Sequence, residues 1–264
     1  MTNWKSPSAV AETEQRFVRL AHVILGLSLW EIATTFDYEL DVLRGKRPYR
    51  WTIWVHSSCR ISLVTALVIL IVTKDVVGLS DCTAWDASIY VFAYLSLALA
   101  SSLVLLRVLA IWQGNLAVVL MSIAIWTTSI VLNIWYISIL RSSYYLAAGE
   151  CVPTTTSKSV VTVVGIIVSD FALLLVMLAG IVKHHKPART MRLTGGHSLW
   201  RLMWQQGIVW LALATLVEVP VLVLVVRNLN DPWDLMFEVV TSATLAISAT
   251  RMYRILSDSL AHSS

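Results

Sequence analysis

The sequence predicts an all-α fold, an integral membrane bundle of seven transmembrane helices. Hydrophobic residues make up 57% of the 264 positions and charged residues 14%, whereas a soluble domain has about 25% charged residues. The mean hydropathy is +0.73, and the apolar residues occur in segments of about 20, the length that crosses a bilayer. We therefore expect one transmembrane domain, residues 16–256, between a polar segment, 1–15, and a short C-terminal tail, 257–264.

The first predicted span is apolar nearly all round, as a helix in contact with lipid must be. A basic turn, 44–50, follows the first span, and the second contains a β-branched run, 64–72. Backbone groups in hydrocarbon must be bonded within their own segment, which favours a helix there as well. An acidic loop, 75–86, precedes the third span, and the connection 113–115 is so short that the third and fourth helices must be antiparallel neighbours. These predicted helices cover 17–36, 51–73, 87–112 and 116–140.

Three further spans complete the predicted bundle. The longest loop, 141–159, leads to the fifth span, and a polar, basic connector, 183–201, leads to the sixth. The sixth contains Pro220, which removes a backbone hydrogen bond and bends a helix. A tight loop, 227–234, precedes the seventh span. These predicted helices cover 160–182, 202–226 and 235–256.

The distribution of lysine and arginine predicts the orientation. Apart from the N-terminal segment, 11 of these residues lie on the side of the 44–50 turn and the 183–201 connector, and 4 lie on the other side. Basic residues favour the cytoplasmic side, so we expect the N-terminus outside and the C-terminus in the cytoplasm, in the plasma membrane or the endoplasmic reticulum. Because the basic residues lie beside membrane segments, we expect lipid and no nucleic acid as partners. A cytoplasmic partner at the connector is one further expectation.

Two of the three cysteines lie in predicted outer loops. A disulfide between Cys82 and Cys151 would join these loops in an oxidising compartment, and two unrelated free thiols are the alternative. Cys59 lies within a span, where a small apolar side chain packs well.

Charged residues in the predicted inner half form the first group of candidate sites. An ionised side chain in hydrocarbon costs roughly 3 kcal/mol or more unless it is paired or hydrated. We therefore expect Glu31 to form a buried ion pair with Arg60 or Arg107, while Arg251 extends to the surface. Such a pair either fixes the register of the helices without any chemistry or belongs to a functional site.

Three carboxylic acids in the predicted outer half form the second group. Asp170, Glu218 and Glu238 have no basic side chain at a matching depth. Burial disfavours the charged form of a carboxyl group, and perturbed groups often mark functional sites. We predict that at least two of them line a ligand-binding cavity, where they would bind a cation, relay protons or act as general acids. The alternative is that Glu238 is solvated at the surface and that Asp170 bonds a backbone carbonyl.

No metal site and no cofactor are expected. The adjacent His184 and His185 would point in different directions on a helix, and His56 and Cys59 are too few to form a metal site by themselves. The seventh span contains no lysine, which excludes a retinal Schiff base.

The predicted architecture resembles that of G-protein-coupled receptors, with seven spans, an outside N-terminus, a basic connector after the fifth helix and an outer disulfide. Leu106-Arg107-Val108 stands where such receptors carry an acid-Arg-aromatic motif, and the seventh helix has no Asn-Pro-x-x-Tyr motif. Most of the chain is similar to a large set of uncharacterised seven-helix proteins of basidiomycete (mushroom-forming) fungi, which implies a membrane protein of unassigned role. The segments that carry this similarity are Leu29-Trp30-Glu31, Phe36-Asp37-Tyr38-Glu39, Arg44-Gly45-Lys46-Arg47, Arg50-Trp51, Arg60 and 106–112.

A second resemblance, to fungal membrane-bound terpene cyclases, implies an enzyme. Those enzymes are seven-helix chains of similar size that use a Trp-Glu pair and a late Asp as acids, and Trp30-Glu31 and Asp234 match in type. In that family the Trp-Glu pair lies on a later helix. The resemblance implies that Glu31 donates a proton and that aromatic ring faces stabilise carbocations.

Three functional hypotheses follow from the sequence. The first is a receptor or sensor that binds a small apolar or cationic ligand among the third, fifth, sixth and seventh helices, with Glu218 beside the Pro220 bend as the central polar contact. The second is a membrane-embedded enzyme such as a terpene cyclase, with Glu31, Asp234 or Glu218 as a general acid kept neutral by burial. The third is a proton-coupled transporter that uses the same carboxylic acids.

Overall fold

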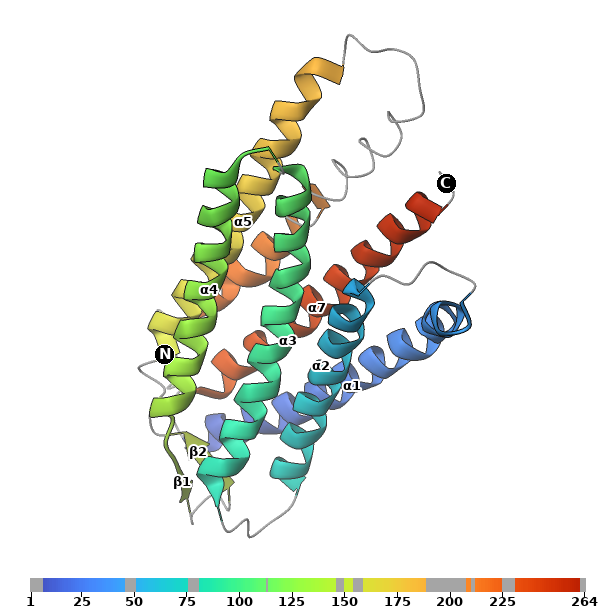
Figure 1. Ribbon diagram of the computed structural model, residues 1–264. Helices are drawn as coiled ribbons and strands as arrows, with labels where there is room; N and C mark the ends of the chain where they lie inside the picture. Colours follow the sequence, from blue (N-terminus) through green and yellow to red (C-terminus); the bar gives the residue numbers. More distant parts are fainter. Residues whose placement is uncertain are drawn as a thin grey trace.

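The computed structural model describes residues 7–45, 51–75, 81–112, 114–145, 150–153, 159–188, 208–209, 212–224 and 231–261. Within these residues the fold is all-α apart from two short strands (Figure 1). The long helices are α1 (Pro7–Leu43), α2 (Thr52–Asp75), α3 (Cys82–Ile111), α4 (Leu116–Ile139), α5 (Ser159–Ala188) and α7 (Asp231–Ala261). A shorter helix, Ala212–Leu224, comes between α5 and α7 in the sequence. The strands β1 (Ser142–Tyr145) and β2 (Glu150–Pro153) pair in antiparallel register, with Tyr144 opposite Cys151.

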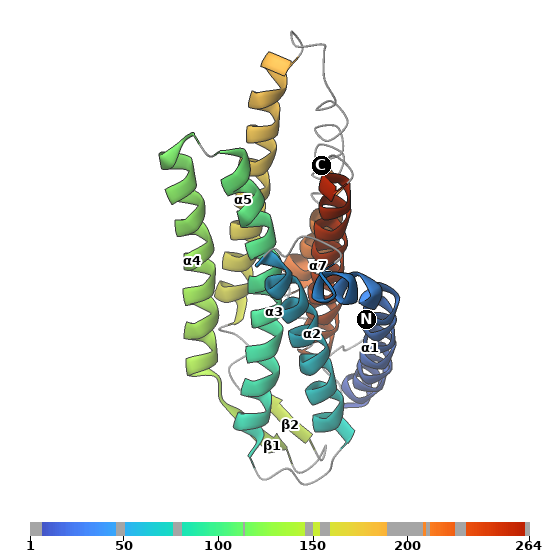
Figure 2. The ribbon, with the colours of Figure 1, turned by 45° about the vertical axis from the view of Figure 1, so that its right-hand side comes forward.

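Helix α3 lies at the centre of the bundle. It packs against α2, α4, α5 and α7, whereas α1 packs against α2 and α7. Figure 2 shows α3 between α4 and α2, with α1 at the edge of the bundle. The main hydrophobic core accordingly contains α3 side chains that are almost completely buried, such as Ala100 and Val108. Side chains on α3 can therefore contact residues from several other helices.

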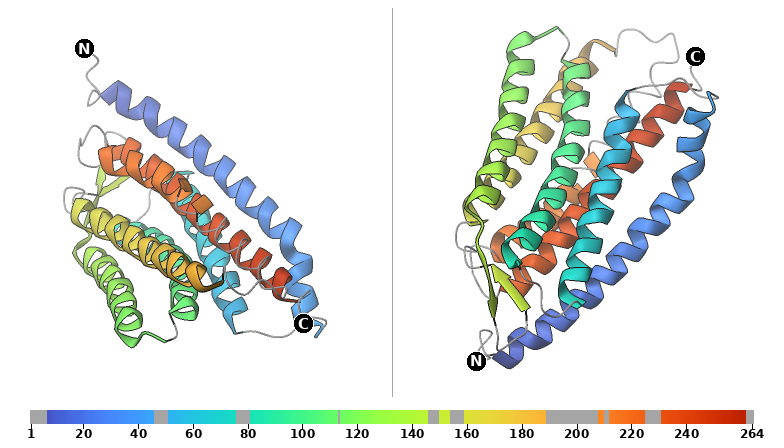
Figure 3. Two further views of the ribbon diagram at one scale, coloured as in Figure 1. Left: turned by 90° about the horizontal axis from the view of Figure 1, so that it is seen from above. Right: turned by 60° about the horizontal axis from the view of Figure 1, so that its bottom comes forward.

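The two ends of the bundle are different. The strands β1 and β2 lie beside the N-terminal end of α3 (Figure 3, right), where the Thr83 hydroxyl donates a hydrogen bond to the Ser142 carbonyl at 3.1 Å. This end is named the strand end, and the other is named the opposite end. Both α1 and α7 begin near the strand end and finish near the opposite end (Figure 3, right).

Five of the described helices are long and apolar enough to cross a membrane. Their outer surfaces carry large apolar side chains, as at Trp30 in α1, Val131 in α4 and Val168 in α5, which are 68%, 63% and 61% exposed. Large apolar surfaces of this kind are unfavourable in water and are typical of helices that face lipid. The chain is therefore a helical membrane-embedded protein. The five segments are Glu12–Val42, Thr52–Lys74, Cys82–Ile111, Leu116–Ile139 and Val160–Lys183.

Two predicted loops differ from the structure. The loop expected over 141–159 contains β1 and β2, because the tyrosines of β1 favour an extended backbone. The acidic loop expected over 75–86 is shorter, since the Asp81 side chain caps α3 by accepting a hydrogen bond from the Ala84 amide at 3.1 Å. Asp86, which was expected in that loop, lies within α3 and is buried.

The order of the described helices agrees with the prediction. Helix α3 ends at Ile111 and α4 begins at Leu116, so the short 113–115 connection is where it was expected. Helix α1 continues to Leu43, well beyond the predicted end at residue 36, because its polar last turns extend past the apolar segment. Of the predicted sixth span, 202–226, the structure describes 208–209 and 212–224, and the helix continues through Pro220.

A close contact near the opposite end holds α5 against α3. A Cβ atom at Gly180 would lie only 2.5 Å from Nε1 of Trp112. The same indole nitrogen donates a hydrogen bond to the Val176 carbonyl at 3.0 Å, and the Lys183 ammonium lies 4.9 Å from the centre of a Trp112 ring. The absence of a side chain at Gly180 thus lets α5 lie close to α3. This contact keeps α5 against α3.

Candidate functional site

Asp170 lies in the middle of α5 and is held by a side chain of α3. The Ser101 hydroxyl donates a hydrogen bond to Oδ1 of Asp170 at 2.7 Å. The contact that the structure gives Asp170 is thus a hydroxyl group on a neighbouring helix, and not the backbone carbonyl that was the alternative.

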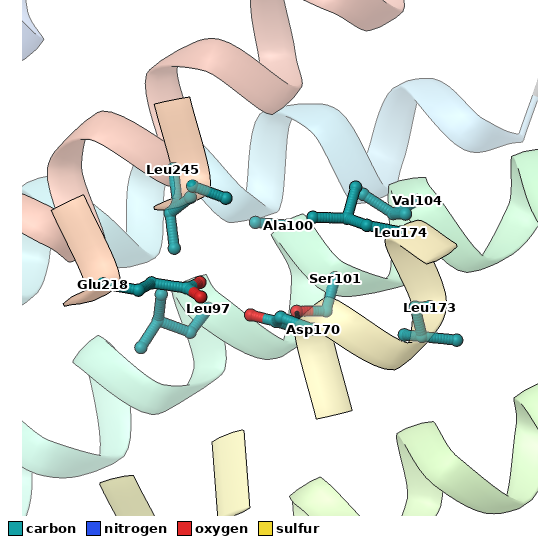
Figure 4. A pocket seen from close by; sticks show the side chains of 10 residues that line it. Leu97, Ala100, Ser101, Val104, Asp170, Leu173, Leu174, Glu218 and Leu245 are labelled. Carbon is teal, nitrogen blue, oxygen red and sulfur yellow. Dashed lines mark hydrogen bonds between the residues drawn. The ribbon is translucent and has the colours of Figure 1, made fainter. Parts of the chain in front are cut away.

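Glu218 faces Asp170 across a small apolar cavity. The residue is only 2% exposed, and neither of its carboxyl oxygens has a hydrogen-bond partner in the described part of the chain. Figure 4 shows these oxygens directed toward Asp170, with Leu97 and Leu245 on either side. The cavity has a volume of about 10 Å³, close to the minimum that holds one water molecule.

The wall that α3 contributes to this cavity follows from helical spacing. Leu97, Ala100, Ser101 and Val104 line it, and these positions lie on one face of a helix because they are three, four and seven residues apart. Ala100 has no side chain beyond Cβ, which leaves room beside the Ser101 hydroxyl. Helices α5, Ala212–Leu224 and α7 supply the remaining walls. The predicted grouping of the third, fifth, sixth and seventh helices is therefore the grouping around Glu218.

Glu238 lies in a second cavity that also contacts Glu218. This cavity has a volume of about 30 Å³ and is lined by Thr241 and Ser242 of α7, among others. The Thr241 hydroxyl donates a hydrogen bond to the Val217 carbonyl at 3.2 Å, which ties α7 to the helix that carries Glu218. Glu218 consequently stands between two cavities, with Asp170 on one side and Glu238 on the other.

The cavities beside Glu218 contain carboxyl groups without a nearby positive charge among the described residues. No basic side chain lines either cavity among the residues that the structure describes. Two carboxyl groups that face each other in apolar surroundings are not both ionised unless a cation lies between them. The arrangement of Asp170 and Glu218 can therefore hold a proton, bind a cation or accept a hydrogen bond from a ligand.

At the opposite end, the predicted partners of Glu31 are wrong. Glu31 pairs with Arg251, whose Nε lies 2.9 Å from Oε1 and whose Nη2 lies 2.5 Å from Oε2. The Glu31 side chain is 6% exposed and that of Arg251 is 59% exposed. Arg251 is exposed, as expected, and it also binds Glu31, because α7 packs against α1. This bidentate pair joins the two helices.

Arg60 lies beside Glu31 but pairs with a different carboxylate. Its Nη1 donates to Oε1 of Glu39 at 3.3 Å, and its Nη2 donates to the Glu31 carbonyl at 2.7 Å and to the Thr35 hydroxyl. Arg107 is half-buried on α3, and no ion pair includes it among the described residues. The predicted ion pair of Glu31 with Arg60 or Arg107 is therefore replaced by two separate pairs.

Two predicted site residues have side chains that the structure does not describe. They are Asp234, in α7, and Cys151, in β2. Cys82, the first residue of α3, takes part in a disulfide bond, whereas Cys59 is a buried free thiol. The 183–201 connector is described only to Ala188, where α5 ends.

Two polar residues of these sites were not predicted. Ser101, which holds Asp170, gave a weak signal, because a serine within an apolar segment usually bonds its own helix backbone. Glu39 lies beyond the predicted end of the first span at residue 36, but it follows Glu31 by eight residues and shares its face, because α1 continues to Leu43. No group of three His, Cys, Asp or Glu side chains that could hold a metal ion occurs in the part of the chain that is described.

The comparisons with known proteins provide no relative. A scan against models of protein families finds no match, and a search of the curated proteins finds no significant one. The geometry and chemistry of the site itself are therefore the guide to its function.

Proposed function

We propose that this chain is a receptor- or sensor-type membrane protein that binds a small cation at Glu218. One observation carries the proposal. The Glu218 carboxyl group is buried between two cavities, and both of its oxygens lack a hydrogen-bond partner among the described residues. A charged group in this position costs roughly 3 kcal/mol or more in a membrane, and a bound cation would offset that cost.

The size and chemistry of the cavities limit the ligand. Volumes of about 10 and 30 Å³ admit a monovalent metal ion, an ammonium ion or a methylammonium group, and exclude a terpenoid or a peptide. The ligating groups would be the carboxyl oxygens of Glu218 and Asp170 and the hydroxyl of Ser101, and oxygen ligands of this kind suit hard cations.

Binding at this position would give a receptor a way to respond. The first cavity is bordered by α3, α5, the helix Ala212–Leu224 and α7. A cation that contacts both Asp170 and Glu218 favours conformations in which α5 and the Ala212–Leu224 helix are close together. The relative positions of these helices at the opposite end would then depend on the ligand.

Thermal unfolding in defined salts tests the proposal. Purified protein in detergent–lipid micelles is heated at constant ionic strength in sodium, potassium, ammonium or methylammonium chloride, with N-methylglucamine chloride as the reference. We expect at least one cation to raise the unfolding midpoint of the wild type, since a ligand at 100 times its Kd adds about 2.7 kcal/mol of stability. Glu218→Gln is expected to abolish the increase and Asp170→Asn to reduce it.

A matched control is Glu12→Gln. Glu12 is an exposed carboxylate of α1 that pairs with Arg16, so its amide variant should retain the full cation response. The same midpoint in all salts, or an equal response of the Glu218→Gln variant and the wild type, would overturn the proposal.

A proton-coupled transporter is the second candidate. The observation that favours it is the series of three carboxylic acids, Asp170, Glu218 and Glu238, in adjoining cavities, with Glu238 also bordering a groove near the strand end. The protein is reconstituted in vesicles with a pH gradient, and proton flux is followed with an internal dye. Flux that Glu218→Gln abolishes would favour a transporter, and folded protein without flux would favour the receptor.

The enzyme hypothesis has less support from the geometry. Glu31 is the acceptor in a bidentate pair with Arg251, which stabilises the ionised carboxylate and disfavours a neutral acid. Glu218 has the burial that a neutral general acid needs, but its cavities are too small for a prenyl substrate.

We also propose seven spans, with an outside N-terminus and a cytoplasmic C-terminus, in the plasma membrane or the endoplasmic reticulum. Helix α7 has 31 residues, about 46 Å at 1.5 Å per residue, which exceeds a hydrocarbon core of about 30 Å. Membership in the uncharacterised fungal set stays a prediction.

The partner of Cys82 is proposed to be Cys151, the remaining cysteine once Cys59 is a free thiol. Peptide mapping without reduction should recover the Cys82 and Cys151 peptides as one linked species. A free thiol at Cys151 would contradict the pairing.

A further inference from the structure

A third cavity lies near the strand end, between α1, α2, α3 and α7. Its volume is about 80 Å³, larger than the two cavities at Glu218. Phe17 of α1, Leu63, Leu67 and Leu70 of α2 and Ile89 of α3 form its apolar wall. This cavity is named the α2 groove. Since it borders Glu238 and Ser242 but not Glu218, an inference about it goes beyond the function proposed above.

The α2 groove is long. The α2 residues that line it extend from Leu63 to Lys74, which is about 16 Å along a helix axis at 1.5 Å per residue. Its volume is about half that of the cavity of roughly 150 Å³ that admits a benzene ring. This length suits a slender, unbranched chain better than a rigid six-membered ring.

The end of the groove nearest the strands is polar. Thr73, Lys74 and Asp86 line it there. Asp86 is 9% exposed, and its Oδ2 has no hydrogen-bond partner within the described residues. The Lys74 ammonium forms an ion pair with Glu14, so its charge is already balanced. The Ser142 side chain lies close to the Asp86 carboxyl group, so the atom that still lacks a hydrogen-bond donor at this end is Oδ2.

We propose that the α2 groove binds an unbranched aliphatic chain that ends in a hydrogen-bond donor, an ammonium or a hydroxyl group. The apolar wall from Phe17 to Leu63 contacts the chain, and Oδ2 of Asp86 accepts a hydrogen bond from the donor. An ammonium group also gains from the carboxylates of Asp86 and Glu238, whereas a carboxylate at the end of the chain is repelled by them.

A photoaffinity experiment tests this assignment. The probe is hexylamine with a diazirine at the far end of its chain, and it is irradiated with the full-length protein in detergent micelles. We expect the label on the α2 peptide that contains Leu63 and Leu67 or on the α1 peptide that contains Phe17. Unlabelled hexylamine should remove at least nine-tenths of the label, whereas hexanoate at the same concentration should leave it unchanged.

Competition by 1-hexanol shows whether the site accepts a hydroxyl group as well as an ammonium group. Equal competition by 1-hexanol and hexylamine assigns the site to either donor, and competition by hexylamine alone assigns it to the ammonium. Both outcomes support the proposal. Equal competition by hexanoate overturns it, because the groove would then bind any aliphatic chain without regard to its end group.

Variants separate the polar end from the apolar wall. Asp86→Asn should lower the labelling at least fivefold for the amine probe. Ala93→Leu and Ala66→Leu, which add volume at two different walls of the groove, should each abolish the label, and either one is sufficient if the other does not fold. Glu12→Gln should label like the wild type. Unchanged labelling in a folded Ala93→Leu or Ala66→Leu protein would place the probe elsewhere and overturn the proposal.

Discussion

Buried carboxyl groups have different partners at the opposite end of the bundle and in its middle. At the opposite end Glu31 is held by Arg251, and Arg60 is held by Glu39. In the middle, Asp170 has only a hydroxyl donor from Ser101, and Glu218 has no hydrogen-bond partner among the described residues. Paired charges fix the contacts of α1 with α2 and α7, whereas the unpaired carboxyl group is the one that the proposed cation would contact.

The largest expected effect comes from breaking a pair at the opposite end. Arg251→Gln leaves the Glu31 carboxylate buried without its partner, which we expect to lower the free energy of unfolding by about 3 kcal/mol. Denaturant titration in detergent–lipid micelles measures this change, and Arg19→Gln, at an exposed position of α1, is the control. The cation response at Glu218 should persist. A loss below about 0.5 kcal/mol would show that Glu31 is hydrated rather than paired.

A smaller effect is expected from the contact that holds α5 beside α3. A Cβ atom at Gly180 would collide with the Trp112 indole, whereas one at Gly26 would meet nothing within 4 Å. Gly180→Ala should therefore lower the free energy of unfolding by about 2 kcal/mol, and Gly26→Ala should leave it unchanged or raise it. Equal effects of the two alanine variants would contradict the close approach of α3 and α5.

The smallest expected effect concerns the hydroxyl that holds Asp170. Ser101→Ala removes one hydrogen bond and should lower the free energy of unfolding by about 1 kcal/mol. Because Asp170 is then less well positioned, the cation that stabilises the wild type should bind severalfold more weakly. Ser88→Ala is a suitable control, since that hydroxyl donates to the Ala84 carbonyl of its own helix. A cation affinity unchanged by Ser101→Ala would exclude Asp170 from the site.

The sequence predicted the helices better than it predicted their contacts. Apolar segments long enough to cross a bilayer define the membrane helices without any knowledge of packing. The grouping of Asp170 with Glu218 was also predicted, because carboxylic acids without basic residues at the same depth have few alternatives to a shared cavity. The partner of Glu31 was not predicted correctly. Three arginines lie at a similar predicted depth in the membrane, and only the packing of α7 against α1 selects Arg251.

Some errors have local causes that the sequence does contain. Asp81 is a good N-cap residue. Helix α3 therefore begins at Cys82, five residues before the predicted start at residue 87, and Asp86 becomes a buried helical residue. The polar last turns of α1 place Glu39 beside Arg60, although hydropathy alone ends that span earlier. N-caps and polar helix extensions therefore determine which charged residues lie within the helices. A hydropathy pattern alone does not predict these caps and extensions.

The difference between the two regions is tested most directly by two amide variants with the same chemical change. In buffer without the stabilising cation, Glu31→Gln should lower the free energy of unfolding by about 2 kcal/mol, because it weakens a bidentate ion pair. Glu218→Gln should instead raise it by about 1 kcal/mol, because it replaces a carboxyl group that is costly to bury in its charged form by an amide that carries no charge. Opposite signs would support the account. A comparable destabilisation by Glu218→Gln would contradict it, since Glu218 would then be a structural group with a partner of its own.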